Sequence, residues 1–246
     1  MRLVNRLVGG VSRRVGRPEL LAVVDGAARQ AQREEIGIRA VLASSLRGSG
    51  TYVDVGANRG QVLREAVRAA PDARHFAFEP IPELAAQVRR SFPSVEVRAK
   101  ALGEQPDTAE FCHFRKLDGW SGLRRRPEIS DSVGEPEYIT VEISTLDIEM
   151  QGIEPAVLKI DVEGAEGAVL SGGRGLLTSV RPLIIFEHVY EAAALYGVER
   201  GAPWDLLSEL GYEVFSATGE GPFTRAAFAD PGPIVNWLAV PSGARA

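Results

Sequence analysis

Acidic side chains and one histidine follow two hydrophobic runs in the second half of the chain. LKIDVEGAE sets Asp161 directly after an apolar run, and PLIIFEH ends in Glu187 and His188. If both runs are strands of an open α/β sheet, these groups lie at its carboxyl edge, where such sheets bind ligands. There a histidine can remove a proton from a hydroxyl, and carboxylate oxygens can hold a hard cation such as Mg²⁺ that makes the hydroxyl more acidic.

The residue types suggest a role for each of these groups. His188 is the predicted general base, because the ordinary pKa of histidine is about 6.5. Asp161 and Glu187 are the predicted catalytic carboxylates, and their oxygens are also the predicted ligands of a Mg²⁺ ion. A structural or metal-coordinating role for His188 stays open. Alternate residues of a strand share a face, so Lys159 lies on the same face as Asp161.

Other titratable residues near these runs have simpler explanations. Glu163 and Glu166 lie three residues apart at the predicted start of a helix, where the helix dipole favours acids. That explanation suffices for Glu166, whereas Glu163 is predicted to contact the substrate, with a first-turn role as the alternative. His75 and His113 are predicted to be structural.

A glycine-rich turn, VDVGANRG at residues 53 to 60, stands in the first half of the chain. A strand over 52–55 should end where Gly56 permits a positive φ or a close backbone approach, and Gly60 should open a helix. A ligand would meet free N–H groups and the positive end of that helix. The spacing matches neither the G-x-G-x-x-G dinucleotide fingerprint nor a phosphate-binding loop ending in Gly-Lys-Ser/Thr, which disfavours a pyrophosphate.

The next predicted strand, HFAFEP, ends in Glu79. An acid in this position of a doubly wound sheet hydrogen-bonds a ribose diol. An adenosine-bearing ligand without a pyrophosphate points to S-adenosylmethionine as the cofactor. Its amino-acid end is predicted to lie against Asp54, Gly56, Asn58 and Gly60. The alternatives are a tight turn without a ligand and, for Glu79, a solvated carboxylate.

An ordered set of motifs resembles the FkbM family of S-adenosylmethionine-dependent methyltransferases. The set consists of VDVGANRG, FEP, ALGE, LKIDVEGAE and PLIIFEH, which cover residues from about Thr51 to His188, and the closing NWLAVP is also similar. The resemblance implies a seven-stranded sheet with its last strand antiparallel. It also implies O-methylation of hydroxyls, commonly on sugars or natural products, and an adenine pocket at Ala101 and Leu102. Packed core residues would look the same at those two positions.

The elements that must position these groups alternate from Thr51 onwards between β-rich runs and amphipathic helical runs. Such alternation predicts βαβ units and a parallel sheet, here a Rossmann-like doubly wound sheet of the class I methyltransferase type. The preceding segment shows helical spacing in two runs, 18–35 and 36–47, which predicts a helical cap that helps to shape the acceptor pocket. We predict an N-terminal arm and cap over 1–47 and a methyltransferase domain over 48–246.

A polar segment at 115–136 interrupts the alternation between TAEFCHF and YITVEIS, which predicts a hairpin-like insertion with a long loop that acts as a lid. In it, Trp120 and Ser121 are candidate acceptor contacts, although a plain surface loop fits equally well. GWSGL is not a nucleophile elbow, because Leu123 replaces the last glycine of that motif. The arginines at 124–126 are expected to face water, with contact to an anionic acceptor as the alternative.

The composition limits the classes of partner. The chain has 246 residues with a formal net charge of -5, which argues against a general nucleic-acid binder and for a small-molecule or glycan acceptor. Its single cysteine, Cys112, excludes an internal disulfide framework and fits the cytoplasm. No apolar run reaches the roughly 18 residues of a membrane span. The arm at 1–17 has five arginines and no acid, and is predicted to be exposed, with membrane-surface or partner docking as the alternative. The oligomeric state is not predicted.

Two other functions stay open at this stage. The first is methylation of an amine or a protein by the same cofactor. The second is a non-catalytic cofactor-binding or scaffold subunit that keeps the fold, against which the intact Asp161, Glu187 and His188 argue.

Overall fold

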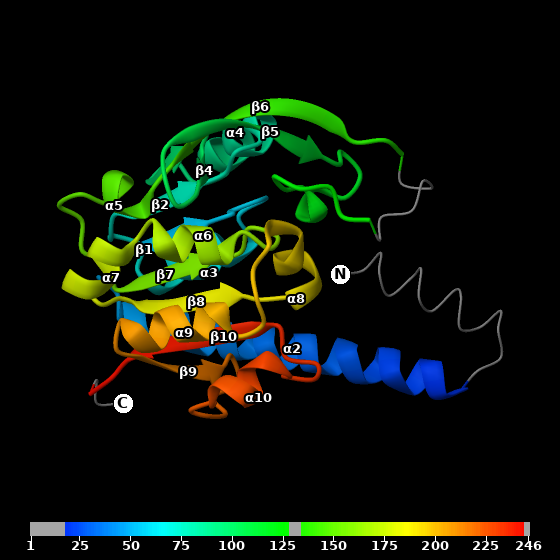
Figure 1. The fold of residues 1–246 in the computed structure, drawn as a ribbon. Helices are drawn as coiled ribbons and strands as arrows, with labels where there is room; N and C mark the ends of the chain where they lie inside the picture. Colours follow the sequence, from blue (N-terminus) through cyan, green and yellow to red (C-terminus); the bar gives the residue numbers. More distant parts are fainter. Residues whose placement is uncertain (1–17, 128–133, 244–246) are drawn as a thin grey trace.

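Seven strands form the central sheet, in the spatial order β3-β2-β1-β7-β8-β10-β9 (Figure 1). Their bounds are β1 Tyr52–Val55, β2 His75–Phe78, β3 Val95–Arg98, β7 Val157–Ile160, β8 Leu183–Glu187, β9 Tyr212–Ser216 and β10 Asn236–Pro241. Neighbouring strands are parallel except that β10 runs antiparallel to both β8 and β9. This arrangement confirms the predicted doubly wound sheet of seven strands with its last strand antiparallel.

The computed structural model describes residues 18–127 and 134–243. The arginine-rich arm at 1–17, with its predicted exposure and possible docking contacts, lies outside the described residues. Among the described residues, no helix combines the length and the apolar character that a membrane crossing requires.

Helices cover both faces of the sheet. Those of one face are α2 (Pro18–Leu46), α3 (Gln61–Ala69) and α4 (Pro82–Ser91), and those of the other are α6 (Glu166–Ser171), α7 (Arg174–Ser179) and α9 (Ala202–Glu209). Every residue of β1, β2 and β7 is buried. Parallel strands covered on both faces have nearly continuous apolar sequences, which explains why these strands can be recognised in the sequence.

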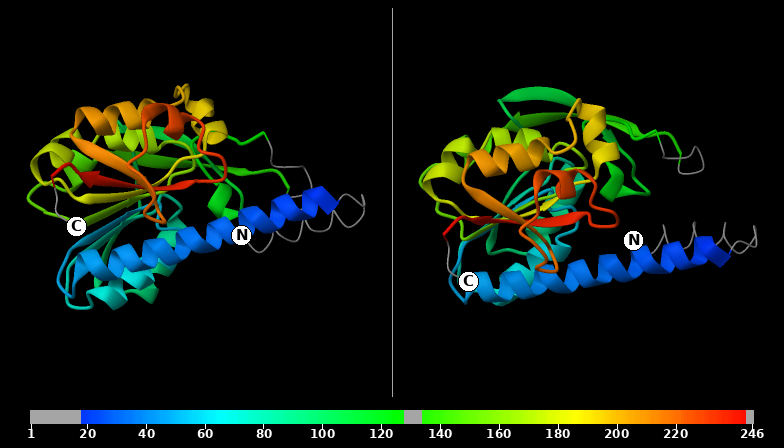
Figure 2. Two further views of the ribbon diagram at one scale, coloured as in Figure 1. Left: turned by 90° about the horizontal axis from the view of Figure 1, so that it is seen from below. Right: turned by 60° about the horizontal axis from the view of Figure 1, so that its bottom comes forward.

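The N-terminal helix α2 is one continuous helix of 29 residues rather than the two predicted runs. It packs closely because Gly37 has no side chain: a Cβ there would lie 2.0 Å from the carbonyl oxygen of Ala217. The fully buried Glu34 accepts a hydrogen bond of 2.8 Å from Asn236 Nδ2. These contacts fasten α2 to the β9 and β10 edge, while its first turns project beyond the sheet (Figure 2).

A separate three-stranded sheet lies at the top of the molecule in Figure 1. It consists of β4 (Ala101–Leu102), β5 (Asp107–His113) and β6 (Glu137–Ser144). The β5 and β6 strands are antiparallel, so the segment between them returns as the predicted hairpin-like insertion. The described part of that segment holds a short 3₁₀ helix, η1 (Asp118–Trp120), and a bridge between Cys112 and Gly122.

The remaining elements are short. They are α5 (Leu146–Glu149), α8 (Tyr190–Ala193), the 3₁₀ helix η3 (Ala194–Tyr196) and α10 (Arg225–Ala229). One structural histidine links the core strands: the ring of His75 is buried and contacts backbone groups through both nitrogens, Tyr52 N at 3.2 Å and Ala70 O at 2.8 Å. This accords with the predicted structural role of His75.

Candidate cofactor and acceptor site

A pocket of about 500 Å³ opens at the carboxyl ends of the central strands, and residues of the three-stranded sheet line part of it. Its lining residues come from the glycine turn, from the ends of β2, β7 and β8, from β4 and from the insertion. No described residue of α2 lines it, so the expectation that the N-terminal helix shapes the acceptor pocket is wrong for this cavity. The reason is that α2 packs along α3, on one face of the sheet.

The glycine turn has the predicted strained backbone. Gly56 has a φ of 83°, and a Cβ there would lie 1.8 Å from the carbonyl oxygen of Asp161. Gly60 has a φ of 74° and would meet the ring of Phe92 at 2.5 Å. Asn58 has a φ of 47°. Glycine is therefore required at 56, where the turn passes close to the chain that follows β7, and at 60, where the turn lies against the ring of Phe92.

The N–H groups of this turn differ from expectation. Gly56 N and Ala57 N both donate to Phe78 O at 3.0 Å, and Asn58 N donates to Glu79 Oε2 at 2.7 Å. These groups hold the turn against β2, so they are not free for a ligand. The N–H groups that lack an intrahelical carbonyl are those at the start of α3, where Gln61 and Val62 line the pocket.

Glu79 stands at the end of β2 with only 4% of its surface exposed. Its Oε2 accepts from Asn58 N, and its Oε1 accepts from Ile81 N at 2.9 Å. Burial raises the pKa of Glu79 to about 7, against the opposing effect of these two backbone donors. Each oxygen keeps a second lone pair, and the carboxylate is held still in the pocket wall.

A charged group of three residues forms the floor of the pocket. Asp54 and Lys159 are partners across β1 and β7, and Lys159 Nζ lies 3.5 Å from Asp54 Oδ1 and 3.0 Å from Asp161 Oδ2. Burial raises the pKa of Asp54 to about 6, although Lys159 opposes the rise. Burial also acts to lower the pKa of Lys159, but the charges of Asp161 and Asp54 outweigh it and hold that pKa above its ordinary value.

An apolar wall lies beside this floor. Ala101 and Leu102 are both buried and both line the pocket. Ile81, Ala101, Phe111 and Leu123 pack in one hydrophobic cluster and all face the cavity, so the three-stranded sheet supplies part of the wall. A flat aromatic ring such as adenine fits an apolar wall of this kind.

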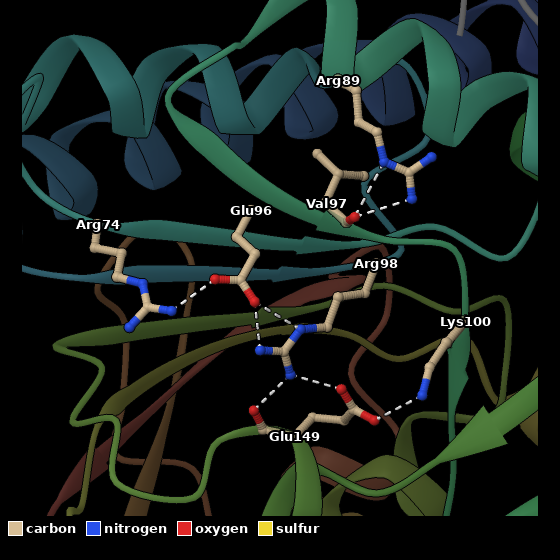
Figure 3. A network of polar contacts seen from close by, with 7 residues as sticks. All are labelled: Arg74, Arg89, Glu96, Val97, Arg98, Lys100 and Glu149. Carbon is tan, nitrogen blue, oxygen red and sulfur yellow. Dashed lines mark hydrogen bonds and ion pairs between the residues drawn. The ribbon is translucent and has the colours of Figure 1, made fainter.

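An ionic network fixes the chain that leads into this wall (Figure 3). Arg98 on β3 donates to Glu96 Oε1 at 3.0 and 2.5 Å, and to the carbonyl and carboxylate oxygens of Glu149 at 2.7 and 2.6 Å. Lys100 Nζ lies 3.3 Å from Glu149 Oε1. The network ties the end of β3 to α5, which sets the path of the following two residues of β4.

Three carboxylates converge at the other side of the pocket. Asp161, Glu163 and Glu187 each offer one oxygen, and these oxygens lie within 4.8 Å of one another. Burial and, to a smaller extent, the charge of Asp161 raise the pKa of Glu163 to about 8. The same two causes hold the pKa of Glu187 well above its ordinary value. Such a cluster either shares protons or binds a cation.

The backbone around Glu163 explains how it reaches the cluster. Glu163 has a φ of 59°, and α6 begins only at Glu166, so Glu163 lies in a turn before the helix. Glu166 is fully buried in protein, and its Oε1 accepts from Val162 N and Gly164 N at 3.0 Å each. Glu166 thus holds the turn, whereas Glu163 lines the pocket and pairs with Arg126 at 2.7 Å.

Three of the predicted residues, Gly60, His188 and Trp120, do not line the pocket. The ring of His188 is buried and stacks on Phe228 with 5.3 Å between the ring centroids, and burial lowers its pKa. Trp120 packs beneath the guanidinium of Arg126, which lies 5.4 Å from its ring. Ser121 does line the pocket, but its Oγ accepts a hydrogen bond of 3.0 Å from Phe114 N.

The structure adds residues that the sequence pattern did not single out. Arg126 was expected to face water, but its side chain is only 14% exposed because it pairs with Glu163. Arg59, inside the glycine turn, forms an ion pair with Asp118 of η1. Lys159 joins Asp54 to Asp161. The sequence predicted only that Lys159 lies on the same strand face as Asp161. The contacts Arg126–Glu163, Arg59–Asp118 and Lys159–Asp54 join segments far apart in the chain.

One family model matches the sequence, and several solved structures are similar to the chain. The family model described as the methyltransferase FkbM domain matches residues 54–214. No curated protein matches the sequence. Among solved structures, the methyltransferase FkbM from Methylobacillus flagellatus KT is similar over 78% of this chain, with 15% identity and a TM-score of 0.48, and this chain covers 43% of its length.

Two further solved structures are similar over most of both chains. The plantazolicin methyltransferase BpumL in complex with SAH shares 10% identity and a TM-score of 0.44 over 94% of this chain and 93% of the other. A TehB-like SAM-dependent methyltransferase from Corynebacterium glutamicum shares 10% identity and a TM-score of 0.43 over 87% and 96%.

Proposed function

The chain belongs to the FkbM family of S-adenosylmethionine-dependent methyltransferases, and we propose that it transfers the sulfonium methyl to a hydroxyl oxygen of a small-molecule or glycan acceptor. The observation that carries the choice of acceptor is the cluster of Asp161, Glu163 and Glu187 beside the cofactor pocket. A hydroxyl is a weak nucleophile. Methyl transfer to it is faster when a nearby group takes its proton or when a cation makes it more acidic. The carboxylate cluster offers both.

We assign the cofactor to the part of the pocket between the turn and the apolar wall. Glu79 accepts hydrogen bonds from the ribose hydroxyls. Ala101 and Leu102 lie against the adenine. Asp54 holds the amino-acid end together with the turn at Gly56, Asn58 and Gly60. Because the sulfonium lies between the ribose and the amino-acid chain, these contacts direct the methyl towards Asp161.

In the proposed step, the acceptor oxygen attacks the methyl carbon in line with the carbon–sulfur bond. The carbon–oxygen bond forms as the carbon–sulfur bond breaks, and S-adenosylhomocysteine leaves with the bonding electron pair. Alignment supplies much of the rate, because the sulfonium charge already activates the methyl group. The hydroxyl proton passes to Glu187, whose raised pKa makes it a better base than an ordinary carboxylate.

This assignment changes the role of His188, the predicted base. Its ring packs against Phe228 and does not line the pocket, so we propose that His188 supports the end of β8 and that Glu187 acts as the base. Trp120, which also does not line the pocket, is assigned to orient Arg126, and Ser121 and Glu163 remain the proposed acceptor contacts.

The exchange of Glu187 for glutamine tests the base. We expect turnover of Glu187→Gln to fall by about 100-fold or more, the usual contribution of a general base, while S-adenosylhomocysteine affinity changes by less than about threefold. His188→Asn should lower turnover by less than about tenfold. Glu191→Gln, an exposed acid at α8, is the matched control. The roles are reversed if His188→Asn is the more damaging of the two variants.

The donor set also fits a divalent cation. Asp161 and Glu187, the predicted ligands, and Glu163 each present a hard carboxylate oxygen at suitable mutual distances. A bound Mg²⁺ would polarise the acceptor hydroxyl and orient it. Arg126 and Lys159 already pair with Glu163 and Asp161, and these two cations compete with a metal ion for the same oxygens.

Methyl transfer from labelled S-adenosylmethionine into a fractionated extract of the source cells tests both the function and the metal. We expect label in the small-molecule or glycan fraction. If Mg²⁺ rather than the Glu187 base activates the hydroxyl, excess EDTA should lower the transfer at least tenfold and Mg²⁺ should restore it. Full activity in EDTA would exclude the cation. Label in protein would favour the alternative acceptor class, and cofactor binding without any transfer would favour a non-catalytic subunit.

We further propose that residues 48–246 carry the catalytic domain and that α2, within the predicted arm and cap over 1–47, braces it. The contacts of Glu34 and Gly37 with the β9 and β10 edge support the bracing role. The single cysteine, Cys112, is free and buried, which supports placement in the reducing cytoplasm.

A further inference from the structure

We propose that Lys159 is a positioning residue for the amino-acid end of the cofactor: its ammonium balances the buried Asp54, so that this carboxylate can bind the α-ammonium of S-adenosylmethionine. The inference rests on the proposed function. Lys159 would act through Asp54 and not on the reacting atoms.

The fold fixes Asp54 and Lys159 next to each other on neighbouring strands. Asp54 and Lys159 are direct partners of the parallel strands β1 and β7, which lie at the centre of the sheet. Asp54 is 1% exposed and Lys159 is 5% exposed, and both line the pocket. Strands at the centre of a sheet cannot shift their register without moving whole rows of side chains, so the pair is fixed by the backbone.

Apart from Lys159 and the hydroxyl of Tyr52, which both favour the ionised form, the surroundings of Asp54 are unfavourable for an anion. Asp161 lies on the far side of Lys159 Nζ, and its charge acts against that of Asp54. Glu187 adds a further acid near Lys159. Tyr52, on the same face of β1, is fully buried.

Two other basic residues of the pocket are engaged elsewhere. Arg59 pairs with Asp118, and Lys100 lies 2.7 Å from Glu142 and 3.3 Å from Glu149. Within the described part of the chain, Lys159 is therefore the cation that the structure pairs with Asp54. A buried carboxylate that loses its counter-charge is left uncompensated, which is costly.

Asp54 has an acceptor site to spare. Its Oδ1 is buried and lies 3.5 Å from Lys159 Nζ, but it accepts no hydrogen bond from the described residues. Buried polar atoms are nearly always satisfied, and an ammonium group carries three donors. The α-ammonium of the cofactor is the cation that matches this oxygen, because Glu79 at the other end of the turn is suited to the ribose hydroxyls.

The two halves of the ligand separate this role from a structural one. S-adenosylhomocysteine carries the amino-acid end, whereas 5′-methylthioadenosine has the same adenosine and thioether without it. Isothermal titration of both ligands into the wild-type chain and Lys159→Met gives the comparison. We expect Lys159→Met to lower the affinity for S-adenosylhomocysteine at least about 30-fold, the usual effect of breaking a desolvated charge pair. The affinity for methylthioadenosine should change less than about threefold.

Two further variants complete the test. Asp54→Asn should weaken S-adenosylhomocysteine by itself, and adding Lys159→Met to it should cost little more, because the lysine then has no partner to balance. Lys100→Met is the matched control: it removes a lysine beside the adenine-binding segment and should leave the ratio of the two affinities unchanged. If Lys159→Met does not fold, Lys159→Gln takes its place.

The outcomes separate the inference from the function on which it rests. Equal weakening of both ligands by Lys159→Met, or an unchanged affinity for S-adenosylhomocysteine, would overturn the role of Lys159 while the cofactor assignment stands. A wild-type chain that binds neither ligand would overturn the cofactor assignment itself, and the inference with it.

Discussion

Replacing Glu79 by alanine should remove measurable binding of S-adenosylmethionine. The proposed ribose contacts are hydrogen bonds to a charged acceptor, each worth about 1.5–3 kcal/mol, so the loss of two corresponds to about 100-fold or more in affinity. Glu79 also accepts hydrogen bonds from Asn58 N and Ile81 N, so its loss removes contacts that hold the turn as well as the proposed contacts to the ribose. Calorimetric titration of the cofactor measures the effect.

Two controls decide whether the ribose contact is responsible. Glu83→Gln removes an exposed acid from α4 and should not change the affinity. Glu79→Gln keeps the shape of the side chain but offers N–H donors to the backbone amides, so we expect it to resemble the alanine variant. Wild-type affinity in either Glu79 variant would exclude Glu79 as the ribose ligand.

Replacing Gly56 by alanine should destabilise the whole domain. The new Cβ would lie 1.8 Å from Asp161 O, on a backbone with a φ of 83°, so β1 and the chain after β7 would have to separate. Overpacking of this kind costs about 1–3 kcal/mol or more, to which the left-handed backbone adds about 1–2 kcal/mol. For a domain of this size the sum lowers Tm by about 5 °C or more.

Gly152 provides the matched control for this substitution. Its φ is 74°, but a Cβ there would meet nothing within 4 Å. Gly152→Ala therefore isolates the cost of the left-handed backbone, and Tm should fall by about 2–6 °C. Thermal unfolding of both variants, followed by circular dichroism, gives the difference. Equal shifts would show that the contact with Asp161 contributes nothing.

The local features of the site could be predicted because they depend on neighbours in the sequence. Gly56 and Gly60 follow a buried strand, and glycines in such a position predict a turn. Both residues have the positive φ that the turn requires. Glu79 and Asp161 could be placed at the sheet edge because ligands in parallel sheets bind beyond the carboxyl ends of strands. The strands themselves are apolar over nearly their whole length, since helices cover both faces.

The predictions that failed concern where a group points and what it meets. Free N–H groups were expected at the glycine turn, but Phe78 O accepts a hydrogen bond from Ala57 N and Glu79 accepts one from Asn58 N. The position of His188 at the end of β8 was clear from the sequence, yet its ring packs on Phe228. A side chain after the end of a strand can turn to either side, and only the packing around it selects the direction.

The sequence by itself determined the order of strands and helices, the glycine turn, the acid at the end of β2 and the family of the chain. Tertiary structure alone decided that Lys159 lies between Asp54 and Asp161, and that Glu163 completes a carboxylate cluster with Glu187. The contacts of Asp54 with Lys159 and of Glu163 with Glu187 join strands about 100 residues apart or in separate βα units, where no periodicity links the partners. Their distances depend on sheet register and on a positive φ at Glu163, which the fold as a whole imposes.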